Sequence, residues 1–463
     1  MKKILILFFV ISHFSLFAQV EMQYNANAEN LPHWVQLMYA ENPDEGAVIA
    51  AYRNYYKNNK LVKNKHTQYY KRWVRNLSRT TQPIKNRPKS KSSNQWECVG
   101  PWDFDKDAAS RSYAPGAAHL YTVEQSISNP NILYAGSATA GAWKTTDKGA
   151  NWELITRDLD LGGVYAIEID FTNPEIIYIS GSGGIYKSTD GGLSWAIIGD
   201  TSFTNISHSV KDIKLKPSNN LDLFVASSQG LFRSLDGGTN FTQIMAGNFL
   251  EIEFHPNSTD TLYFIQQAGD STLFYRSDDG GNTLTLYTNG WPNPNTVGGQ
   301  QRRTEIAISP AAPNKIVALA TGSANGGSGL YGIYISNDKG VNWTFQCCGP
   351  QPAGPPDSVN INMMGWQPDG SDDGGQYYYD LALAVNPTNS DIIHVGGVNH
   401  WISFDNGVTF TCPSKWSTPH KKGYVHADIH DINYFGNDLW FACDGGVFYS
   451  DNVGDSIYKK QYG

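Results

Sequence analysis

The stretch STDGGLSW, residues 188–195, decides the fold, because variants of it recur six more times along the chain. Its pattern, which we call the box, is Ser/Thr-x-Asp-x-Gly-x-x-aromatic. The carboxylate of Asp190 can accept backbone N–H groups across a tight turn, and Gly192 takes a conformation that a Cβ would penalise. Trp195 starts the next strand and buries a large apolar area. The other copies are TTDKGANW (145–152), SLDGGTNF (234–241), SDDGGNTL (277–284), SNDKGVNW (336–343), SFDNGVTF (403–410) and a worn copy, SDNVGDSI (450–457).

The boxes recur at a spacing typical of propeller blades. Successive Asp positions, with Asn452 in the last copy, are 43, 46, 43, 59, 67 and 47 residues apart. A repeat near 45 residues with four short strands predicts an all-β fold, a β-propeller of about seven four-stranded blades over residues 96–463. Each box would join the third strand of a blade to the fourth. That position predicts a structural role for Asp147, Asp190, Asp236, Asp279, Asp338 and Asp405.

The N-terminal region differs from the rest of the chain. A short basic start, an apolar run from Ile4 to Phe17 and then Ala18 predict a signal peptide over residues 1–18. We therefore expect a secreted protein, and no later stretch is apolar over a membrane-spanning length. Residues 19–95 are expected to form a short helical, basic segment and a linker, and this segment is either a pre-domain or a propeptide.

Charge and motif content disfavour several classes of function. Residues 53–91 hold 13 Lys/Arg and no acidic residue, whereas 20 Lys/Arg face 38 Asp/Glu from residue 97 onward. An acidic body in an exported protein argues against a nucleic-acid partner. No Cys-x-x-Cys spacing suits a thiolate zinc site, and neither a P-loop nor Gly-x-Ser-x-Gly occurs.

Three phrases carry a family resemblance: GQYYYDLALAVNP (375–387), YVHADIHD (424–431) and CDGGVFYS (443–450). With the boxes, they resemble BNR, or Asp-box, repeat proteins and the sortilin N-terminal propeller. They are closer still to large secreted Bacteroidetes proteins of this class, which often end in a type IX secretion sorting domain, a feature that the sequence through Gly463 does not show. The resemblance implies the propeller fold but no activity, because propellers host unrelated functions. Similar proteins usually continue past a seventh box, so a longer ring, such as the ten-bladed sortilin type, stays open.

Longer spacings between some of the boxes predict the location of the functional site. The extra residues fall mostly in 287–301, 348–376 and 411–424, which lead into the first strands of blades five to seven. These loops should rise from the face opposite the boxes and form a binding site for a polysaccharide or an extracellular protein. Their aromatic side chains either stack on a ligand or pack on one another; they are Trp291, Trp366, Trp416 and, just beyond the second loop, the run from Tyr377 to Tyr379.

The densest group of chemically active residues lies in His426-Ala-Asp428-Ile-His430-Asp431. On a strand, His426, Asp428 and His430 would share one face, because alternate side chains do. They would then converge on a ligand or form a hydrogen-bonded set beside the channel. Asp444 and Asp380, in neighbouring phrases, would add carboxylates.

Two further hypotheses use these carboxylates. A glycoside hydrolase needs two carboxyl groups flanking the scissile bond, and Asp380 and Asp428 are the candidates. The loop of residues 369–375 offers closely spaced oxygens that suit calcium, although it lacks the full EF-hand pattern. Its candidate ligands are Asp369, Asp372 and Asp373. The sequence indicates no other cofactor.

Overall fold

The chain divides into two units, residues 1–97 and residues 98–463. The predicted signal peptide and most of the predicted linker lie outside the described residues. No helix among those residues is long and apolar enough to cross a membrane. The computed structural model describes residues 31–40, 43–60, 66–67, 69–70, 119–157, 159, 161–200, 203, 209–292, 300–324, 327–348, 361–418 and 423–460.

The first unit contains the predicted helical segment, as α1 (His33–Met38) and α2 (Glu45–Asn58). The side chain of Asp44 caps α2 by accepting a hydrogen bond from the backbone of Ala47 at 2.8 Å. Trp34 is buried and packs edge-on against Tyr52, with ring centres 4.8 Å apart. An aromatic cluster therefore holds the two helices together.

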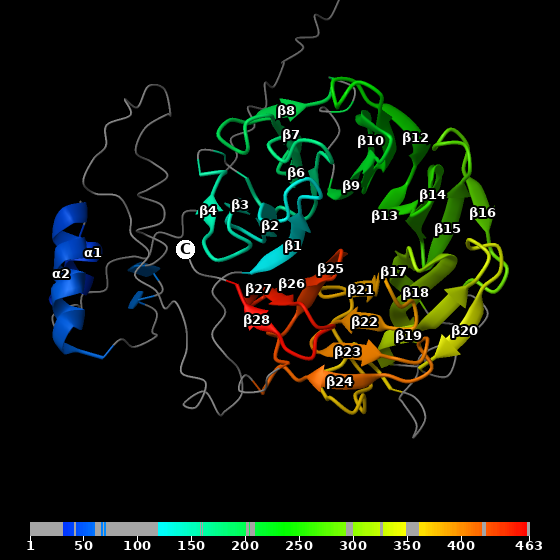
Figure 1. Cartoon of the computed structure of the whole chain (residues 1–463). Helices are drawn as coiled ribbons and strands as arrows, with labels where there is room; N and C mark the ends of the chain where they lie inside the picture. The colour runs from blue at the N-terminus through cyan, green and yellow to red at the C-terminus, as the bar shows by residue number, and fades with distance from the viewer. Residues whose placement is uncertain are drawn as a thin grey trace, which may run out of the picture. The chain divides into compact units, whose positions relative to one another are not determined.

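The second unit is a ring of seven four-stranded antiparallel blades, as predicted (Figure 1). Each blade is contiguous in sequence, and its first strand lies nearest the axis of the ring. Blades 1 to 4 comprise β1 (Leu120–Gln125), β2 (Leu133–Ser137), β3 (Ala142–Thr145), β4 (Glu153–Leu154); β5 (Ile167–Ile169), β6 (Ile177–Gly181), β7 (Gly184–Ser188), β8 (Ala196–Ile198); β9 (Val210–Lys216), β10 (Asn219–Ser227), β11 (Gly230–Ser234), β12 (Thr242–Ala246); and β13 (Asn248–His255), β14 (Ser258–Ala268), β15 (Ser271–Ser277), β16 (Thr285–Tyr287). Blades 5 to 7 comprise β17 (Gln300–Ser309), β18 (Ala312–Ala324), β19 (Gly327–Ser336), β20 (Thr344–Cys347); β21 (Ala382–Val385), β22 (Ile393–Gly396), β23 (His400–Ser403), β24 (Thr411–Ser414); and β25 (Ile429–Phe435), β26 (Asp438–Cys443), β27 (Gly446–Ser450), β28 (Tyr458–Lys459).

The boxes join third to fourth strands and share one hydrogen-bond pattern. In blade 2, Asp190 Oδ1 accepts from the Ser188 hydroxyl and from the Ser194 backbone, both at 2.8 Å. Gly192 donates its N–H to Ser188 Oγ, and its φ of +94° is one that a side chain would strain. A Cβ at Gly192 would also meet Ile155 of blade 1 at 2.7 Å. The box thus closes its own turn and lets neighbouring blades approach.

The ring closes by side-chain packing between blade 1 and blade 7, which we call the seam. Leu120 and Leu133 pack there against Trp440 and Ala442, all at most 5% exposed. Asp431 Oδ2 accepts the backbone N–H of Val123 across the seam at 3.1 Å. The described ring therefore closes with seven blades, and the ten-bladed alternative is wrong for this chain.

Carboxylates on the inner strands tie other neighbouring blades in the same way as Asp431. Each accepts a backbone N–H of the next inner strand, which satisfies a buried donor between two blades. These pairs are Glu168 with Leu215 at 2.8 Å, Asp212 with Ile252 at 2.9 Å and Glu251 with Ile306 at 2.9 Å. Acidic side chains near the axis are thus part of the scaffold.

Candidate binding site at the channel mouth

Among the described residues, five of the seven inner strands carry a β-bulge close to their first residue. In each, one extra residue has no partner in the register with the second strand. A bulge bends the strand and turns the extra side chain out of the regular alternation. The extra residues are Tyr121, Lys211, Leu250, Arg302 and His430, and all five line one cavity.

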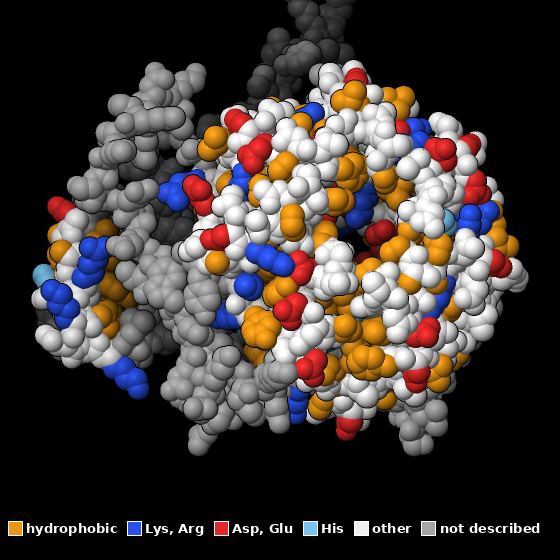
Figure 2. Space-filling model, viewed as in Figure 1, with side chains coloured by type: hydrophobic (Ala, Val, Ile, Leu, Met, Phe, Trp, Pro, Cys, Tyr) orange, Lys and Arg blue, Asp and Glu red, His pale blue; other side chains and the backbone are white. Residues whose placement is uncertain are grey.

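That cavity has a volume of about 1060 Å³ and lies on the axis of the ring. Figure 2 shows the opening at the centre of one face, with acidic and basic side chains inside it. Inner-strand carboxyl groups and Lys214 line its deeper part. The volume suits a small ligand or a segment of a polymer.

Burial shifts the ionisation of the channel groups. Desolvation raises the pKa of Glu253 to about 7 and that of Asp431 to about 6, although the charge of Lys214 opposes both shifts. The side chain of Lys214 is 32% exposed, and the surrounding carboxylates raise its pKa well above the ordinary value although desolvation opposes this. The channel therefore holds protonated and ionised carboxyl groups around one firmly charged amine.

Aromatic and cationic side chains form the rim on the blade 1 to blade 3 side. The rings of Tyr121 and Tyr165 stack with centres 4.5 Å apart, and Tyr165 is 47% exposed. Lys211 Nζ lies 5.9 Å from the centre of the Tyr165 ring. Within the described residues Lys211 forms no ion pair, whereas Arg303 pairs with Glu305 at 3.0 Å. The rim thus offers an aromatic surface beside an exposed amine.

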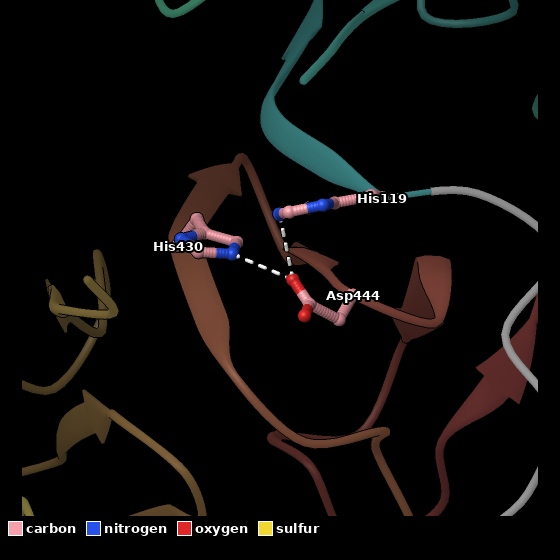
Figure 3. A group of neighbouring side chains, drawn as sticks. All are labelled: His119, His430 and Asp444. Atoms are coloured by element: carbon pink, nitrogen blue, oxygen red, sulfur yellow. Dashed lines mark hydrogen bonds and ion pairs between the residues drawn. The ribbon is translucent and has the colours of Figure 1, made fainter. Parts of the chain in front are cut away.

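A second group lies where blades 6, 7 and 1 meet. Figure 3 shows His119, His430 and Asp444 directed toward one point, and both histidine Nε2 atoms lie 2.9 Å from Asp444 Oδ1. The hydroxyl of Tyr379 lies 2.7 Å from His119 Nε2 and about 3.1 Å from Asp444 Oδ2. Burial opposes ionisation of Asp444, but the His430 hydrogen bond and both histidines hold the pKa of Asp444 below its ordinary value. This group of four residues is the histidine cluster.

The candidate pair Asp380 and Asp428 lies next to the histidine cluster. The side-chain amide of Gln376 donates to Asp428 Oδ1 at 2.7 Å and to Asp380 Oδ2 at 3.4 Å. Burial and the charge of Asp428 raise the pKa of Asp380 to about 8. Burial and the charge of Asp444 raise the pKa of Asp428 to about 6. Asp380 is 1% exposed, so the two carboxyl groups form an adjacent, half-protonated pair.

The predicted strand through His426, Asp428 and His430 is wrong, because β25 starts only at Ile429. Asp428 has a φ of +61°, and His430 is the bulge residue of β25. The alternation of side chains therefore does not hold here. His426 lies against Gly445 and does not line the cavity.

The tryptophans of the long loops lie outside the cavity lining. Trp416 donates its indole N–H to the carbonyl of Trp366 at 3.2 Å, so these two loops bind each other. Trp366 is 43% exposed, whereas Trp291 is buried against Trp343. Of the aromatic candidates, Tyr377, Tyr378 and Tyr379 line the cavity, and Tyr379 also belongs to the histidine cluster.

The predicted calcium ligands do not converge. Asp369 accepts a hydrogen bond from Ser371 in its own turn, and Asp372 accepts from the backbone of Gln367. Among the described residues, the acidic and histidine side chains that gather closely enough to hold an ion are those of the histidine cluster. The structure therefore does not support calcium at Asp369, Asp372 and Asp373.

Sequence reasoning missed His119, Tyr121, Tyr165 and Lys211. Each stands at or just before the first strand of a blade, where side chains reach the channel mouth. The signal that could have found Tyr121, Tyr165 and Lys211 is their place at, or within two residues of, the start of the first strand of a blade.

Comparison with known proteins supports the fold. No protein-family model matches the sequence, and no match was found among curated proteins. Two similar solved structures are glycoside hydrolase family 74 enzymes. The enzyme from Niastella koreensis has a TM-score of 0.51 and 18% identity, over 74% of this chain and 54% of that chain. The xyloglucanase from Xanthomonas campestris has a TM-score of 0.53 and 15% identity, over 76% of this chain and 55% of that chain.

A structure of YCF48 bound to D1 peptide aligns less well, with a TM-score of 0.48 and 17% identity, over 73% of this chain and 92% of that chain. The chain spans about half the length of the two hydrolases. At these identities the likeness shows the fold alone, so the chain is a β-propeller similar in fold to the two hydrolases.

Proposed function

We propose that the protein is an exported binding module whose channel mouth captures a polysaccharide that carries acidic groups. The observation that carries the proposal is the 1060 Å³ cavity with stacked Tyr121 and Tyr165 at its rim. Flat aromatic faces bind the apolar faces of sugar rings, and the exposed amine of Lys211 pairs with a carboxylate. Export rests on the signal-peptide pattern of residues 1–18.

The charges of the site favour a ligand whose acidic groups stay at the rim and whose uncharged part enters the channel. Lys211 and Arg302 lie at the rim, whereas carboxyl groups such as Glu251 and Glu253 line the deeper channel. A carboxylate held at the rim gains an ion pair, but one driven inward loses its water beside carboxyl groups whose own pKa values are raised by burial. Sugar hydroxyls can donate to the inner carboxylates, so the polymer enters with its acidic groups outward.

The alternative is a glycoside hydrolase that uses Asp380 and Asp428. The fold likeness to family 74 enzymes and the raised pKa of Asp380 motivate it. A hydrolase places its two carboxyl groups about 5–10 Å apart on either side of the scissile bond. Here the two groups share the amide of Gln376, and Asp380 is buried. That arrangement favours binding over hydrolysis.

The test compares binding and cleavage on one polysaccharide panel. The full chain is titrated with polygalacturonate, alginate and neutral xyloglucan, and each polymer is also incubated for reducing-end release. We expect saturable binding of an acidic polymer and no cleavage. Tyr165→Ala should weaken binding up to about tenfold through lost stacking. Tyr458→Ala is the matched control, because Tyr458 is an exposed tyrosine on the outer strand of blade 7.

Three outcomes decide against the proposal. Polymer cleavage that Asp428→Asn abolishes would establish the hydrolase. Equal weakening by Tyr165→Ala and Tyr458→Ala would remove the channel mouth as the site. Failure to bind every polymer, with capture of an extracellular protein through Tyr165 and Lys211, would assign a protein ligand instead.

A further inference from the structure

The side chains of the histidine cluster do not satisfy one another as neutral groups. His430 Nδ1 lies 3.2 Å from the backbone carbonyl of Tyr379, and a carbonyl only accepts hydrogen bonds. A neutral His430 has only one N–H, so in either tautomer one ring nitrogen presents a lone pair to an oxygen that also accepts. That nitrogen is Nδ1, facing the Tyr379 carbonyl, or Nε2, facing Asp444 Oδ1 at 2.9 Å. Two acceptors at this distance repel unless a positive charge lies between or beside them.

His119 adds a third donor atom to the same point. Its Nε2 lies 2.9 Å from the same oxygen of Asp444, and the donor atoms of all three residues lie within 4.8 Å of one another. Three electron-pair donors on His119, His430 and Asp444, from two blades, thus converge on one small volume (Figure 3). Convergence of this kind suits a cation with several coordination positions.

We propose that the histidine cluster binds one divalent transition-metal ion of the zinc class, through Nε2 of His119, Nε2 of His430 and a carboxylate oxygen of Asp444. Two nitrogen donors and one oxygen suit Zn²⁺ and its neighbours, whereas Ca²⁺ takes oxygen donors. The site goes beyond the polysaccharide proposal and does not depend on it.

The geometry agrees with a tetrahedral ion. Two imidazoles bound through Nε2 at about 2.0–2.1 Å place their ring centres roughly 5 Å apart, and tetrahedral donors lie about 3.3 Å apart. The His119 and His430 ring centres are 5.3 Å apart. The donor separations of 2.9 Å need to open by a few tenths of an ångström, and the two Nε2 atoms, which lie within 4.8 Å of each other, need to settle about 3.3 Å apart. The side chain of His119 is 35% exposed and can supply that movement.

The surroundings supply the supporting contacts that metal ligands need. The carbonyl of Tyr379 orients His430, as backbone carbonyls do for many metal-bound histidines. The Tyr379 hydroxyl donates to Asp444 and orients the carboxylate. His430 and Tyr379 also line the cavity, so an ion at this place would lie beside the cavity, from which water or a ligand oxygen could supply a fourth donor.

The experiment measures Zn²⁺ binding to the full chain, prepared without a histidine tag and stripped of metal. Calorimetric titration at pH 7.5 should give one Zn²⁺ per chain, and Ca²⁺ should not compete. His119→Gln and Asp444→Asn should each weaken binding at least 100-fold, because each removes a ligand. The matched control is His33→Gln, an exposed histidine in α1.

The refuting results are equally defined. Absence of stoichiometric Zn²⁺, Co²⁺ and Mn²⁺ binding by the wild-type chain would identify the cluster as a charged hydrogen-bond network. Zn²⁺ binding that persists in His119→Gln and in Asp444→Asn would place the ion elsewhere. The thermal midpoint of each metal-free variant is recorded, and Zn²⁺ should raise it for wild type and His33→Gln only. If Asp444→Asn does not fold, the effect of His119→Gln on Zn²⁺ binding decides alone, because the His119 side chain is 35% exposed and its replacement should leave the fold intact.

Discussion

Replacing Asp380 by Asn should make the propeller more stable at alkaline pH. Asp380 is 1% exposed, and its Oδ1 has no hydrogen-bond partner within the described residues. Burial and the charge of Asp428 raise its pKa to about 8. Asn is nearly isosteric with the protonated carboxyl, and it keeps the contact with Gln376 without ever acquiring a charge.

The magnitude follows from proton linkage. The folded pKa is raised, so the stability contribution of Asp380 is fully present below the unfolded pKa of about 3.9 and is lost as pH rises through the folded value. With a folded pKa of about 8, ionisation of Asp380 lowers the unfolding free energy of the wild-type protein by roughly 4 kcal/mol between pH 5 and pH 9. The difference between Asp380→Asn and wild type should grow by that amount.

Urea unfolding, followed by tryptophan fluorescence at pH 5 and pH 9, measures both free energies. Asp373→Asn makes the same chemical change at an exposed carboxylate of the preceding loop and is the control. The other channel carboxyl groups titrate in all three proteins, so their effects cancel in the comparison, whereas the interaction of Asp380 with Asp428 is part of the measured difference. Parallel pH dependence of wild type and Asp380→Asn would refute the reasoning, because Asp380 would then be ionised throughout.

Three other predictions concern the scaffold. Asp338→Ala removes three hydrogen bonds within its box and should lower the unfolding free energy by about 1 kcal/mol. Asp338→Asn should lose less stability, because Asn452 fills the same position in blade 7. Equal urea midpoints for the two variants would contradict this prediction. Hydrogen bonds within the boxes lower the pKa of Asp147, Asp236 and Asp279 to about 2. The stability that these carboxylates contribute is present above about pH 4 and is lost as pH falls toward 2. The circular dichroism signal of Asp236→Asn should therefore change less than that of wild type between pH 4 and pH 2. Trp440→Ala at the seam should cost about 3–5 kcal/mol in urea unfolding, whereas Trp366→Ala, at a side chain 43% exposed, should cost clearly less.

The fold could be predicted because its signal is local and repeated. Each box contains its own turn chemistry, as Ser188, Asp190 and Gly192 show, so seven copies are seven independent indications of a blade. Blade number was harder, because closure depends on packing between residues far apart in sequence, such as Leu120 and Trp440.

The candidate site could be predicted in part. Asp380, Asp428, His430, Asp444 and Tyr379 come together because their phrases stand near the first strands and hairpin of blades 6 and 7. His119 could not be found this way, since only ring closure brings it to blade 7. The strand through His426 failed because a left-handed residue at Asp428 and a bulge at His430 break a period of two. The contact between Trp366 and Trp416 is tertiary and left no local signal.

The seam has a consequence for how binding and folding are related in this molecule. His119 belongs to one end of the ring, and His430 and Asp444 belong to the other, so the three donors exist as a set only while the circle is shut. An ion bound by all three donors would stabilise the closed ring, because its full affinity exists only in the closed state and binding shifts the equilibrium toward that state. Opening of the ring would therefore weaken ion binding at the histidine cluster, which lies beside the proposed polysaccharide site.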